Sequence, residues 1–430
     1  MWHRIQWGIG RIRQKLWAKP LLYAALAIVA LVGAAAADRL KLPLDGVPDI
    51  DTETLEDLLA IIASSMLSVA TLAVASMVAA YASASSTATP RAFSLVVADD
   101  VSQTALSGFI GAFIFSIVAL TAVKTGSYGR VGLFVTFSLT VLIFAMVIMV
   151  FLRWVDRIAR LGRMGSTIDR VETAAREAID RRRARPALGG VRHDGRPAAG
   201  RGVHSATIGY VQSINMSALQ RAAEKCGVRV VVHSLQGSFV TPGKALATLE
   251  AEPGGAPGDA ADFADGFIVG DDRTFEEDPR FGLVTLSEIA ARALSPAVND
   301  PGTAIDITGT FVRLFARWVT PGEELPVEFD RISVPPLSAV DMFDDAFTAI
   351  ARDGAATIEV ATRLQKAFRV LMEIGNDHLH EAALRHSRLA QARADLALKL
   401  PEERDQIRAL AAAVVAARYA VDEPGRTSRP

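Results

Sequence analysis

Residues 131–152 read VGLFVTFSLTVLIFAMVIMVFL and contain no charged side chain. A helix of about 20 predominantly apolar residues crosses the hydrocarbon core of a bilayer, so this stretch predicts a transmembrane helix. Three more uncharged apolar stretches precede it, at residues 21–37, 58–83 and 105–123. We therefore predict a transmembrane domain of four helices in residues 1–152, in keeping with a chain of 430 residues that is 50% hydrophobic.

The first apolar stretch shares three features with a secretory signal peptide, because it is short, follows basic residues and ends in a run of alanines. Three further spans follow it, however. A retained membrane anchor is therefore the better interpretation of this stretch.

The charges beside the spans predict their orientation. The leader has no acidic residue and carries Arg4, Arg11, Arg13, Lys15 and Lys19, and an arginine-rich segment follows the fourth span. Basic flanks remain on the cytoplasmic side, so we expect a multi-pass protein of the bacterial inner (plasma) membrane with both termini in the cytoplasm. The acidic connection between the first two spans fits the outer side.

Small and hydroxyl residues in the second and third spans predict helix association within the bilayer. Ser64, Ser68 and Thr71 recur on one face of the second span, and Gly108 and Gly111 lie in the third. Such residues permit close approach and hydrogen bonding between helices, so we expect self-association, either as a packed helix contact or as a hydroxyl-lined pore. No span contains Asp, Glu, Lys, Arg or His, which disfavours ion-coupled transport.

A basic segment, residues 153–204, joins the membrane domain to the rest of the chain. Its helical periodicity followed by Gly, Pro and Arg predicts a juxtamembrane helix and a flexible linker. We expect no nucleic-acid partner, because no aromatic residues interleave with the arginines and the adjacent lipid bilayer already accounts for the charge. Residues 84–104, between the second and third spans, predict either a short interfacial helix or a buried elbow.

Residues 205–375 predict a cytoplasmic α+β domain, and residues 376–430 predict C-terminal helices with a short tail. The strands are expected at residues 228–233, 267–269 and 329–334, with a hairpin-like pair at 238–250. The helices are expected at residues 281–294, 303–319, 339–374 with a break near Gly354, and 380–420 with a break near Pro401.

No standard catalytic or cofactor motif is present in the sequence. The chain has one cysteine, Cys226, and lacks a P-loop, a nucleophile elbow and a dinucleotide fingerprint. His378, His380 and His386 invite a metal interpretation, but His378 and His380 are nearly opposite on a helix and neither has a His at i+4. We therefore expect no metal and no cofactor, and a non-enzymatic role is favoured over an enzymatic one.

The most distinctive polar segment spans residues 271–304. It contains Arg273-Thr274, Asp278-Pro279-Arg280-Phe281-Gly282 and Asn299-Asp300-Pro301-Gly302-Thr303-Ala304, and further motifs are Ser64-Ser65-Met66 and Gly209-Tyr210-Val211-Gln212. With these motifs the chain resembles the bacterial membrane family called domain of unknown function 2254 over most of residues 15–375. The resemblance implies a multi-span inner-membrane protein with a shared soluble region and no assigned activity.

The polar segment has two interpretations. Asp300 as N-cap, Pro301 at the first helical position and Thr303 at the third predict a helix start. Alternatively, the segment folds into a small pocket for a phosphorylated or cationic ligand or a protein partner. The residues of this candidate ligand or partner site are Arg273, Asp278, Arg292, Asn299, Asp300 and Thr303.

Three classes of function follow, in order of preference. The first is a non-enzymatic homo-oligomer, channel-like or scaffold-like, with a regulatory cytoplasmic domain. The second is a membrane-anchored ligand sensor or adaptor that uses the polar segment. The third is a membrane-bound enzyme that acts on a lipid-like substrate.

Overall fold

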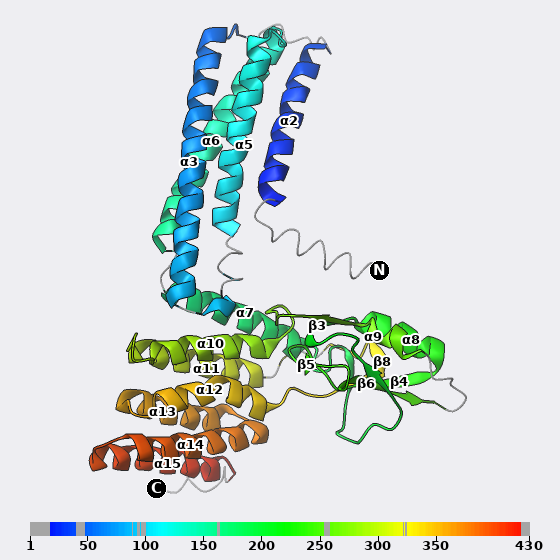
Figure 1. Ribbon diagram of the computed structural model, residues 1–430, viewed down its shortest axis with the longest axis vertical. Coiled ribbons are helices and arrows are strands. Elements are labelled where there is room, and N and C mark those ends of the chain that lie inside the picture. The colour runs from blue at the N-terminus through cyan, green and yellow to red at the C-terminus, as the bar shows by residue number, and fades with distance from the viewer. Residues whose placement is uncertain are drawn as a thin grey trace, which may run out of the picture. The chain divides into compact units, whose positions relative to one another are not determined.

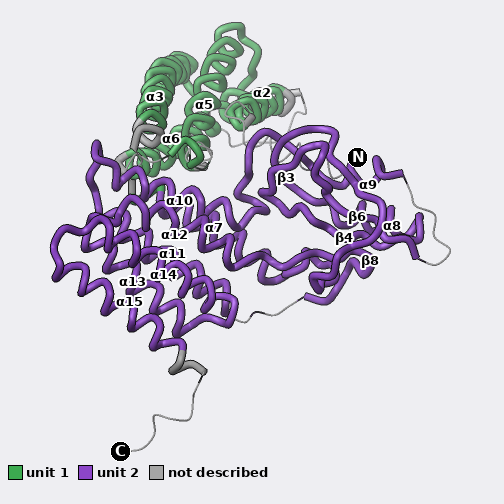
Figure 2. Tube along the Cα trace, turned by 60° about the horizontal axis from the view of Figure 1, so that its bottom comes forward, with its two compact units in different colours: residues 1–167 green, residues 168–430 purple. Residues whose placement is uncertain are grey.

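A computed structural model of the chain describes residues 18–39, 48–87, 89–92, 95, 100–160, 164–252, 259–320, 322 and 325–422. The chain forms two compact units, Met1–Thr167 and Ile168–Pro430 (Figures 1 and 2). Each unit has its own hydrophobic cluster of buried residues.

Unit 1 is helical. Its elements are α2 (Ala18–Arg39), α3 (Thr52–Thr87), the short 3-10 helix η1 (Pro90–Ala92), α5 (Asp100–Lys124) and α6 (Arg130–Arg160). Three segments are long and apolar enough to cross a membrane: Thr52–Ala82, Val101–Lys124 and Arg130–Ile158. They cover the second predicted span up to Ala82 and the whole of the third and fourth predicted spans.

The first predicted span lies in α2, whose apolar stretch Lys19–Ala35 is shorter than the other three. The described residues therefore provide three candidate membrane helices, and the fourth span stays a prediction. Of the interfacial helix predicted between α3 and α5, residues 93, 94 and 96–99 lie outside the described residues.

Helix α5 is the central helix of unit 1. Of its apolar segment 56% is buried, against 33% for α3 and 17% for α6. Phe109 of α5 is fully buried and meets the ring of Trp154 on α6 edge-on, with 6.0 Å between the ring centroids. On the opposite side, a Cβ atom at Gly111 would lie 3.0 Å from the Cβ of Tyr23 on α2. The missing side chain at Gly111 thus allows α2 to approach α5 closely.

Unit 2 contains two sheets. The five-stranded sheet has the order β1-β8-β4-β6-β2, in which β8 runs parallel to β1 and β4, and β6 runs antiparallel to β4 and β2. The three-stranded antiparallel sheet has the order β5-β3-β7. The strand bounds are β1 Gly190–Arg192, β2 Arg201–His204, β3 Gly209–Ile214, β4 Val228–Val232, β5 Phe239–Val240, β6 Ala245–Ala251, β7 Phe267–Gly270 and β8 Phe329–Val334.

Alternating apolar residues place the core between these sheets and two helices, α8 (Met216–Cys226) and α9 (Ala260–Ala264). Val228, Val230 and Val232 on β4 are fully buried in this core. Helix α8 begins at the N-cap Asn215, whose side chain accepts a hydrogen bond from the backbone N–H of Ala218. It packs against β4 and β8.

Residues 238–250 do not form the hairpin that we predicted. Strand β5 pairs with β3 in the smaller sheet, whereas β6 pairs with β4 and β2 in the larger one. The turn at residues 241–244 therefore carries the chain from one sheet to the other. Strand β5 has only two residues and could form few backbone hydrogen bonds with β6. Pairing with the next strand in the sequence therefore does not determine where β5 lies.

Stacked helices form the rest of unit 2 (Figure 1). They are α7 (Met164–Ala184), α10 (Pro279–Ala293), α11 (Pro301–Val319), α12 (Ala339–Asp353), α13 (Ile358–Ile374), α14 (Asp377–Ala397) and α15 (Pro401–Asp422). Helix α10 packs on α12, α11 on α13, α12 on α14 and α13 on α15, so pairs of helices lie in layers. The predicted breaks near Gly354 and Pro401 separate α12 from α13 and α14 from α15, as expected.

Phenylalanine rings fill the centre of the helix stack. Phe311 and Phe315 of α11 contact Phe347 of α12, with ring centroids 5.3 and 5.8 Å apart. Phe368 of α13 meets the same ring at 5.0 Å. Because one aromatic cluster spans α11, α12 and α13, these helices form one core.

The segment predicted as a juxtamembrane helix and flexible linker is largely built into the folded chain. Helix α6 continues to Arg160, α7 follows at Met164, and β1 and β2 occupy residues that we expected to be linker. Helix α7 lies against α10, since Gly282 leaves room for Ala175: a Cβ at Gly282 would lie 2.4 Å from the Cβ of Ala175.

Candidate functional site: an arginine-lined cavity

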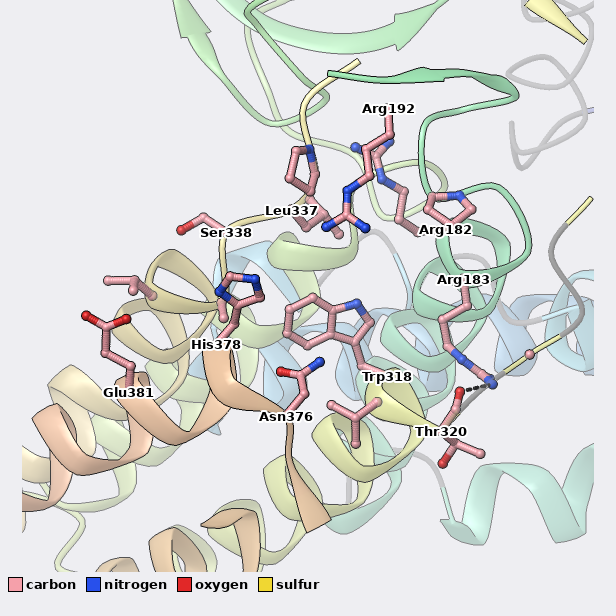
Figure 3. Close-up of a pocket in the computed structure, with 16 residues that line it drawn as sticks. Arg182, Arg183, Arg192, Trp318, Thr320, Leu337, Ser338, Asn376, His378 and Glu381 are labelled. Carbon is pink, nitrogen blue, oxygen red and sulfur yellow. Dashed lines mark hydrogen bonds between the residues drawn. The ribbon is translucent and has the colours of Figure 1, made fainter. Parts of the chain in front are cut away.

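A cavity of ≈ 520 Å³ lies in unit 2 where the ends of several helices meet the sheet (Figure 3). The C-terminal ends of α7 and α11, strand β1, the segment 336–340 and the first turn of α14 form its wall. The residues that line it are Arg182, Arg183, Pro186, Arg192, Trp318, Val319, Thr320, Gly322, Pro336, Leu337, Ser338, Ala339, Val340, Asn376, His378 and Glu381.

Consecutive arginines at the end of α7 point in different directions, because successive residues of a helix are turned by about 100°. Arg181 donates from Nη2 to the carbonyl oxygen of Glu276. Arg183 donates to the Asp180 carboxylate at 3.3 Å and to the carbonyl oxygen of Thr320 at 2.6 Å. Arg182, between them, enters the protein interior.

Arg182 is only 6% exposed, and its Nε and Nη2 atoms have no hydrogen-bond partner among the described residues. Burial lowers the pKa of this guanidinium to about 10, against the opposing influence of the nearby carboxylates of Asp278 and Glu277. Arg182 is therefore still charged at neutral pH. A buried charge without well-placed hydrogen bonds is destabilising by several kcal/mol, so a further negative charge close by would stabilise this arrangement.

Arg192, at the end of β1, is the accessible cation of the cavity. It is exposed, and among the residues that the structure describes it has no hydrogen-bond or ion-pair partner. Figure 3 shows its guanidinium extending into the cavity toward the indole of Trp318. An unpaired guanidinium offers a planar set of donors that fits the oxygens of a phosphate or carboxylate.

Two helices begin at the cavity. Ser338 is the N-cap of α12 and accepts a hydrogen bond from the Asp341 N–H, and Asn376 is the N-cap of α14 and accepts one from the Leu379 N–H. The remaining N–H groups of a first helical turn have no partner within the helix and attract anions. The C-terminal ends of α7 and α11 carry the negative end of the helix dipole. The positive charges of Arg182 and Arg183 lie beside these ends and offset it.

The described residues that line the cavity carry more positive than negative charge, because three arginines face one carboxylate, that of Glu381. Such a cavity concentrates negatively charged ligands. The arrangement is therefore suited to binding an anion.

A polar network lies behind Arg182. Asp278 is 2% exposed, caps α10 by accepting from the Arg280 N–H, and pairs with Arg273, whose Nε lies 2.7 Å from its Oδ2. Glu277 accepts from the Ser213 hydroxyl at 3.0 Å and from the Gln236 amide at 3.1 Å.

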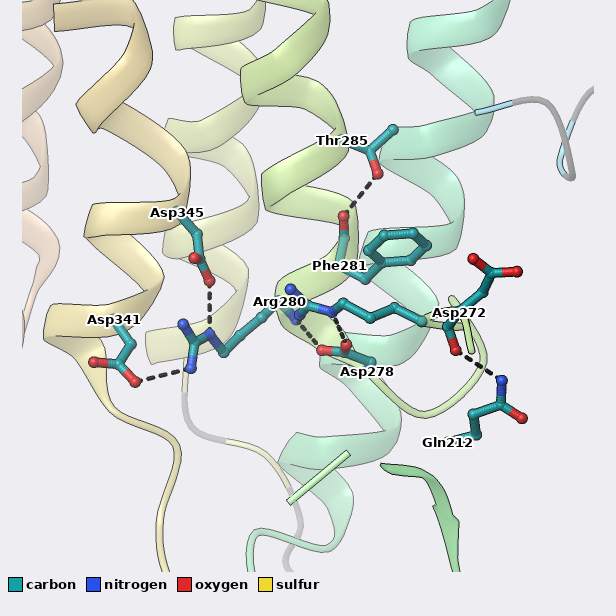
Figure 4. A network of polar contacts seen from close by, with 9 residues as sticks. Gln212, Asp272, Asp278, Arg280, Phe281, Thr285, Asp341 and Asp345 are labelled. Carbon is teal, nitrogen blue, oxygen red and sulfur yellow. Dashed lines mark hydrogen bonds and ion pairs between the residues drawn. The ribbon is translucent and has the colours of Figure 1, made fainter. Parts of the chain in front are cut away.

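Figure 4 shows the adjoining contacts. Arg280 donates to Asp345 at 2.6 Å and to Asp341 at 2.8 Å, and this ties α10 to α12. The Gln212 amide donates to the carbonyl oxygen of Asp272 at 2.7 Å. The network thus holds the sheet, α10 and α12 together behind the cavity.

The structure brings together only part of the predicted polar segment. Arg273 and Asp278 pair at the start of α10, whereas Arg292 and the loop of Asn299 lie at its other end, about 22 Å away along a helix of 15 residues. Asp300 caps α11 as predicted, since its carboxylate accepts from the Thr303 N–H at 3.2 Å and from the Thr303 hydroxyl at 2.6 Å.

The candidate residues of the membrane spans fall on two kinds of surface. Ser64, Ser68 and Thr71 are exposed, and each hydroxyl donates to a carbonyl oxygen of its own helix, 2.9 to 3.1 Å away. Gly108 and Gly111 are buried in unit 1. A Cβ atom at Gly108 would lie 3.8 Å from Val150 of α6, so the two glycines face different helices.

The three histidines near the start of α14 occupy different surroundings. His378 is exposed and lines the cavity, whereas His380 is 3% exposed. His386 is buried beside Phe343 and Phe347, and its Nε2 lies 3.0 Å from Asp344. Among the described residues no group of three His, Cys, Asp or Glu side chains is placed to hold a metal ion.

Sequence reasoning missed the cavity. Arg182 belongs to a run that we assigned to the bilayer surface, Arg192 lies ten residues later in the segment that we expected to be linker, and Trp318 is far from both in the sequence. One signal was available: three consecutive arginines cannot all lie on the solvent face of a single helix. The sequence did not show that this segment meets the end of α11 at one cavity.

A family model described as a predicted membrane protein, domain of unknown function 2254, matches residues 13–370. The chain belongs to this family. It is thus a membrane protein, and the resemblance inferred from the polar segment is confirmed.

Curated relatives match a smaller part of this family member. An uncharacterized protein of Mycobacterium bovis and one of Mycobacterium tuberculosis are each 35% identical to it over 105 residues, which is 23% of this chain and 20% of each relative. The matched region of the chain thus spans about a fifth of the length of these relatives. No solved structure gives a significant match.

Proposed function

We propose that this family member is a membrane-anchored receptor for an anionic small molecule. In this proposal α2 is a fourth span beside α3, α5 and α6, both termini lie in the cytoplasm, and unit 2 binds the ligand there. The basic flanks of the spans support this orientation in a bacterial inner membrane. No activity beyond ligand binding is needed to account for the site.

One observation carries the proposal: the cavity contains the exposed Arg192, which has no hydrogen-bond or ion-pair partner among the described residues, together with the buried charge of Arg182. Arg192 would contact the ligand directly. Arg182, whose Nε and Nη2 are covered, would act through its field in a region of low dielectric constant. Both features favour a negatively charged occupant over a neutral one.

Inorganic pyrophosphate is a suitable first probe, because it presents several oxygens and no other recognition feature. We expect millimolar pyrophosphate to raise the melting temperature of the full chain in detergent micelles, at constant ionic strength. The increase should be lost in Arg192→Gln. Arg221→Gln is the matched control, because Arg221 is an exposed arginine on α8 that does not line the cavity.

The proposal fails if neither pyrophosphate nor an organic phosphate changes the melting temperature of the unaltered chain. It also fails if Arg192→Gln and Arg221→Gln respond to pyrophosphate like the unaltered chain, since the anion would then bind elsewhere.

A second candidate function is a homo-oligomeric channel or scaffold. The observation that favours it is the outward position of Ser64, Ser68 and Thr71 on α3, which leaves a hydroxyl face available to another copy of the chain. If this face lines a pore, Ser68→Leu should abolish ion conductance in reconstituted vesicles without changing the oligomer size. Undiminished conductance would exclude a pore at this face.

A further inference from the structure

We propose that the anionic ligand of the cavity is a nucleoside phosphate, a molecule that combines phosphate groups with a planar aromatic base. This inference rests on the proposed function and specifies the chemical class of its ligand. The cavity volume of ≈ 520 Å³ lies within the roughly 300–1,000 Å³ of small-molecule sites.

The aromatic half of the site is Trp318, near the C-terminus of α11. Its indole is half-buried and is supported by Phe315, whose ring centroid lies 6.3 Å away at an interplanar angle of 57°. The indole also lines the cavity, where Figure 3 shows it between Arg192 and Asn376. A base that stacks on an indole is bound through its π-face, which inorganic anions and sugar phosphates lack.

The phosphate half of the site is Arg192 with the helix starts of α12 and α14. The guanidinium of Arg192, which has no partner in the part of the chain that the structure describes, extends toward the indole, so one ligand can reach both groups. First-turn N–H groups of the two helices add donors for phosphate oxygens.

Polar groups beside Trp318 can contact the edge of a base. The Asn376 side chain uses its oxygen to cap α14, which leaves its amide N–H groups as donors. The exposed His378 adds a ring nitrogen on the same helix. The cavity therefore pairs an anion-binding end with a wall that suits a heterocyclic base.

The test compares ligands that contain each half alone. ADP, pyrophosphate, glucose 6-phosphate and adenosine are titrated into the full chain in detergent micelles, and binding is followed by calorimetry. We expect ADP to bind at least about tenfold more tightly than pyrophosphate, because a base stacked on an aromatic ring contributes an amount of this order. Adenosine should bind weakly, since it lacks the anionic groups.

Variants of Trp318 then locate the base. Trp318→Leu should remove the preference for ADP over pyrophosphate and leave pyrophosphate binding unchanged, whereas Trp318→Phe should restore part of the preference. Quenching of tryptophan fluorescence by ADP should be smaller in Trp318→Phe than in the unaltered chain, which has five tryptophans.

The outcomes separate this inference from the proposed function. If pyrophosphate or glucose 6-phosphate binds as tightly as ADP to the unaltered chain, the cavity recognises anions without a base and this inference is wrong, while the proposed function stands. If none of the phosphate-containing probes binds, both fail. An ADP preference that survives Trp318→Leu would also overturn the inference, since the base would lie elsewhere.

Discussion

Single residues create the special features of the cavity. Arg182 is sealed inside the protein, and the carboxylates of Asp278 and Glu277 offset only part of the penalty of its burial. Arg192 is exposed and unpaired among the described residues. Because the sealed charge cannot be screened well by water, it strengthens the attraction that the exposed arginine exerts on an anion.

Gly237 provides a test of the network behind the cavity. Its φ angle is +84°, and a Cβ atom at this position would lie 2.1 Å from Oδ2 of Asp278. We expect Gly237→Ala to reduce the free energy of unfolding by about 2 kcal/mol or more, as measured by urea denaturation of the full chain in micelles.

Gly243→Ala is the matched control for that substitution. A Cβ atom at Gly243 would meet its nearest neighbour, Oγ1 of Thr241, at 4.0 Å. The change in stability should stay within about 0.5 kcal/mol. Equal effects of the two substitutions would show that Gly237 is not constrained by Asp278.

His386 predicts a pH dependence of stability. Burial lowers its pKa from 6.5 to about 4 in the folded chain, despite the opposing effect of Asp344. Between these two pH values the unfolded chain binds a proton that the folded chain does not bind. Stability should therefore decrease by up to about 3 kcal/mol as the pH falls from 6.5 to 4.

The melting temperature of the full chain, measured at intervals over this pH range, checks the prediction. His386→Asn cannot titrate here, so its melting temperature should vary less with pH. A variant profile as steep as that of the unaltered chain would assign the dependence to another group.

At the scale of elements, the sequence predicted helices and strands well where their pattern is local. The start of α11 was predicted because Asp300, Pro301 and Thr303 carry the information for a helix start in adjacent positions. The partner of β5 was not predicted, because it depends on β3, about thirty residues earlier. Likewise, Arg192 and Trp318 line the same cavity only because α7, β1 and α11 pack together.

The packing of α5 against its neighbours can be tested at its two glycines. A Cβ atom would lie 3.0 Å from Tyr23 at Gly111 but 3.8 Å from Val150 at Gly108. Replacing Gly by Ala increases helix propensity by the same amount at both positions. A difference in stability between the two variants therefore measures the effect of packing. We expect Gly111→Ala to be about 1–3 kcal/mol less stable than Gly108→Ala in thermal or denaturant unfolding. Equal stabilities would contradict the close α2–α5 contact.

At the scale of the whole molecule, the composition and the four apolar stretches were enough to predict a membrane region followed by an α+β region. The division into two units and the three long apolar helices agree with that expectation at this coarse level. The cavity depends instead on how helices and a strand of unit 2 pack together. Helix α7 begins four residues after α6 ends, and its last turn supplies Arg182 and Arg183, so the helix that follows the membrane region in the sequence contributes to the cavity wall.

The most direct test of the receptor account is an experimentally determined map of the full chain, purified in micelles and saturated with ADP. We predict density for a diphosphate within hydrogen-bond distance of the Arg192 guanidinium and for a base stacked on Trp318. A map of comparable quality in which this cavity is empty, or in which ADP occupies another part of the chain, would contradict the account.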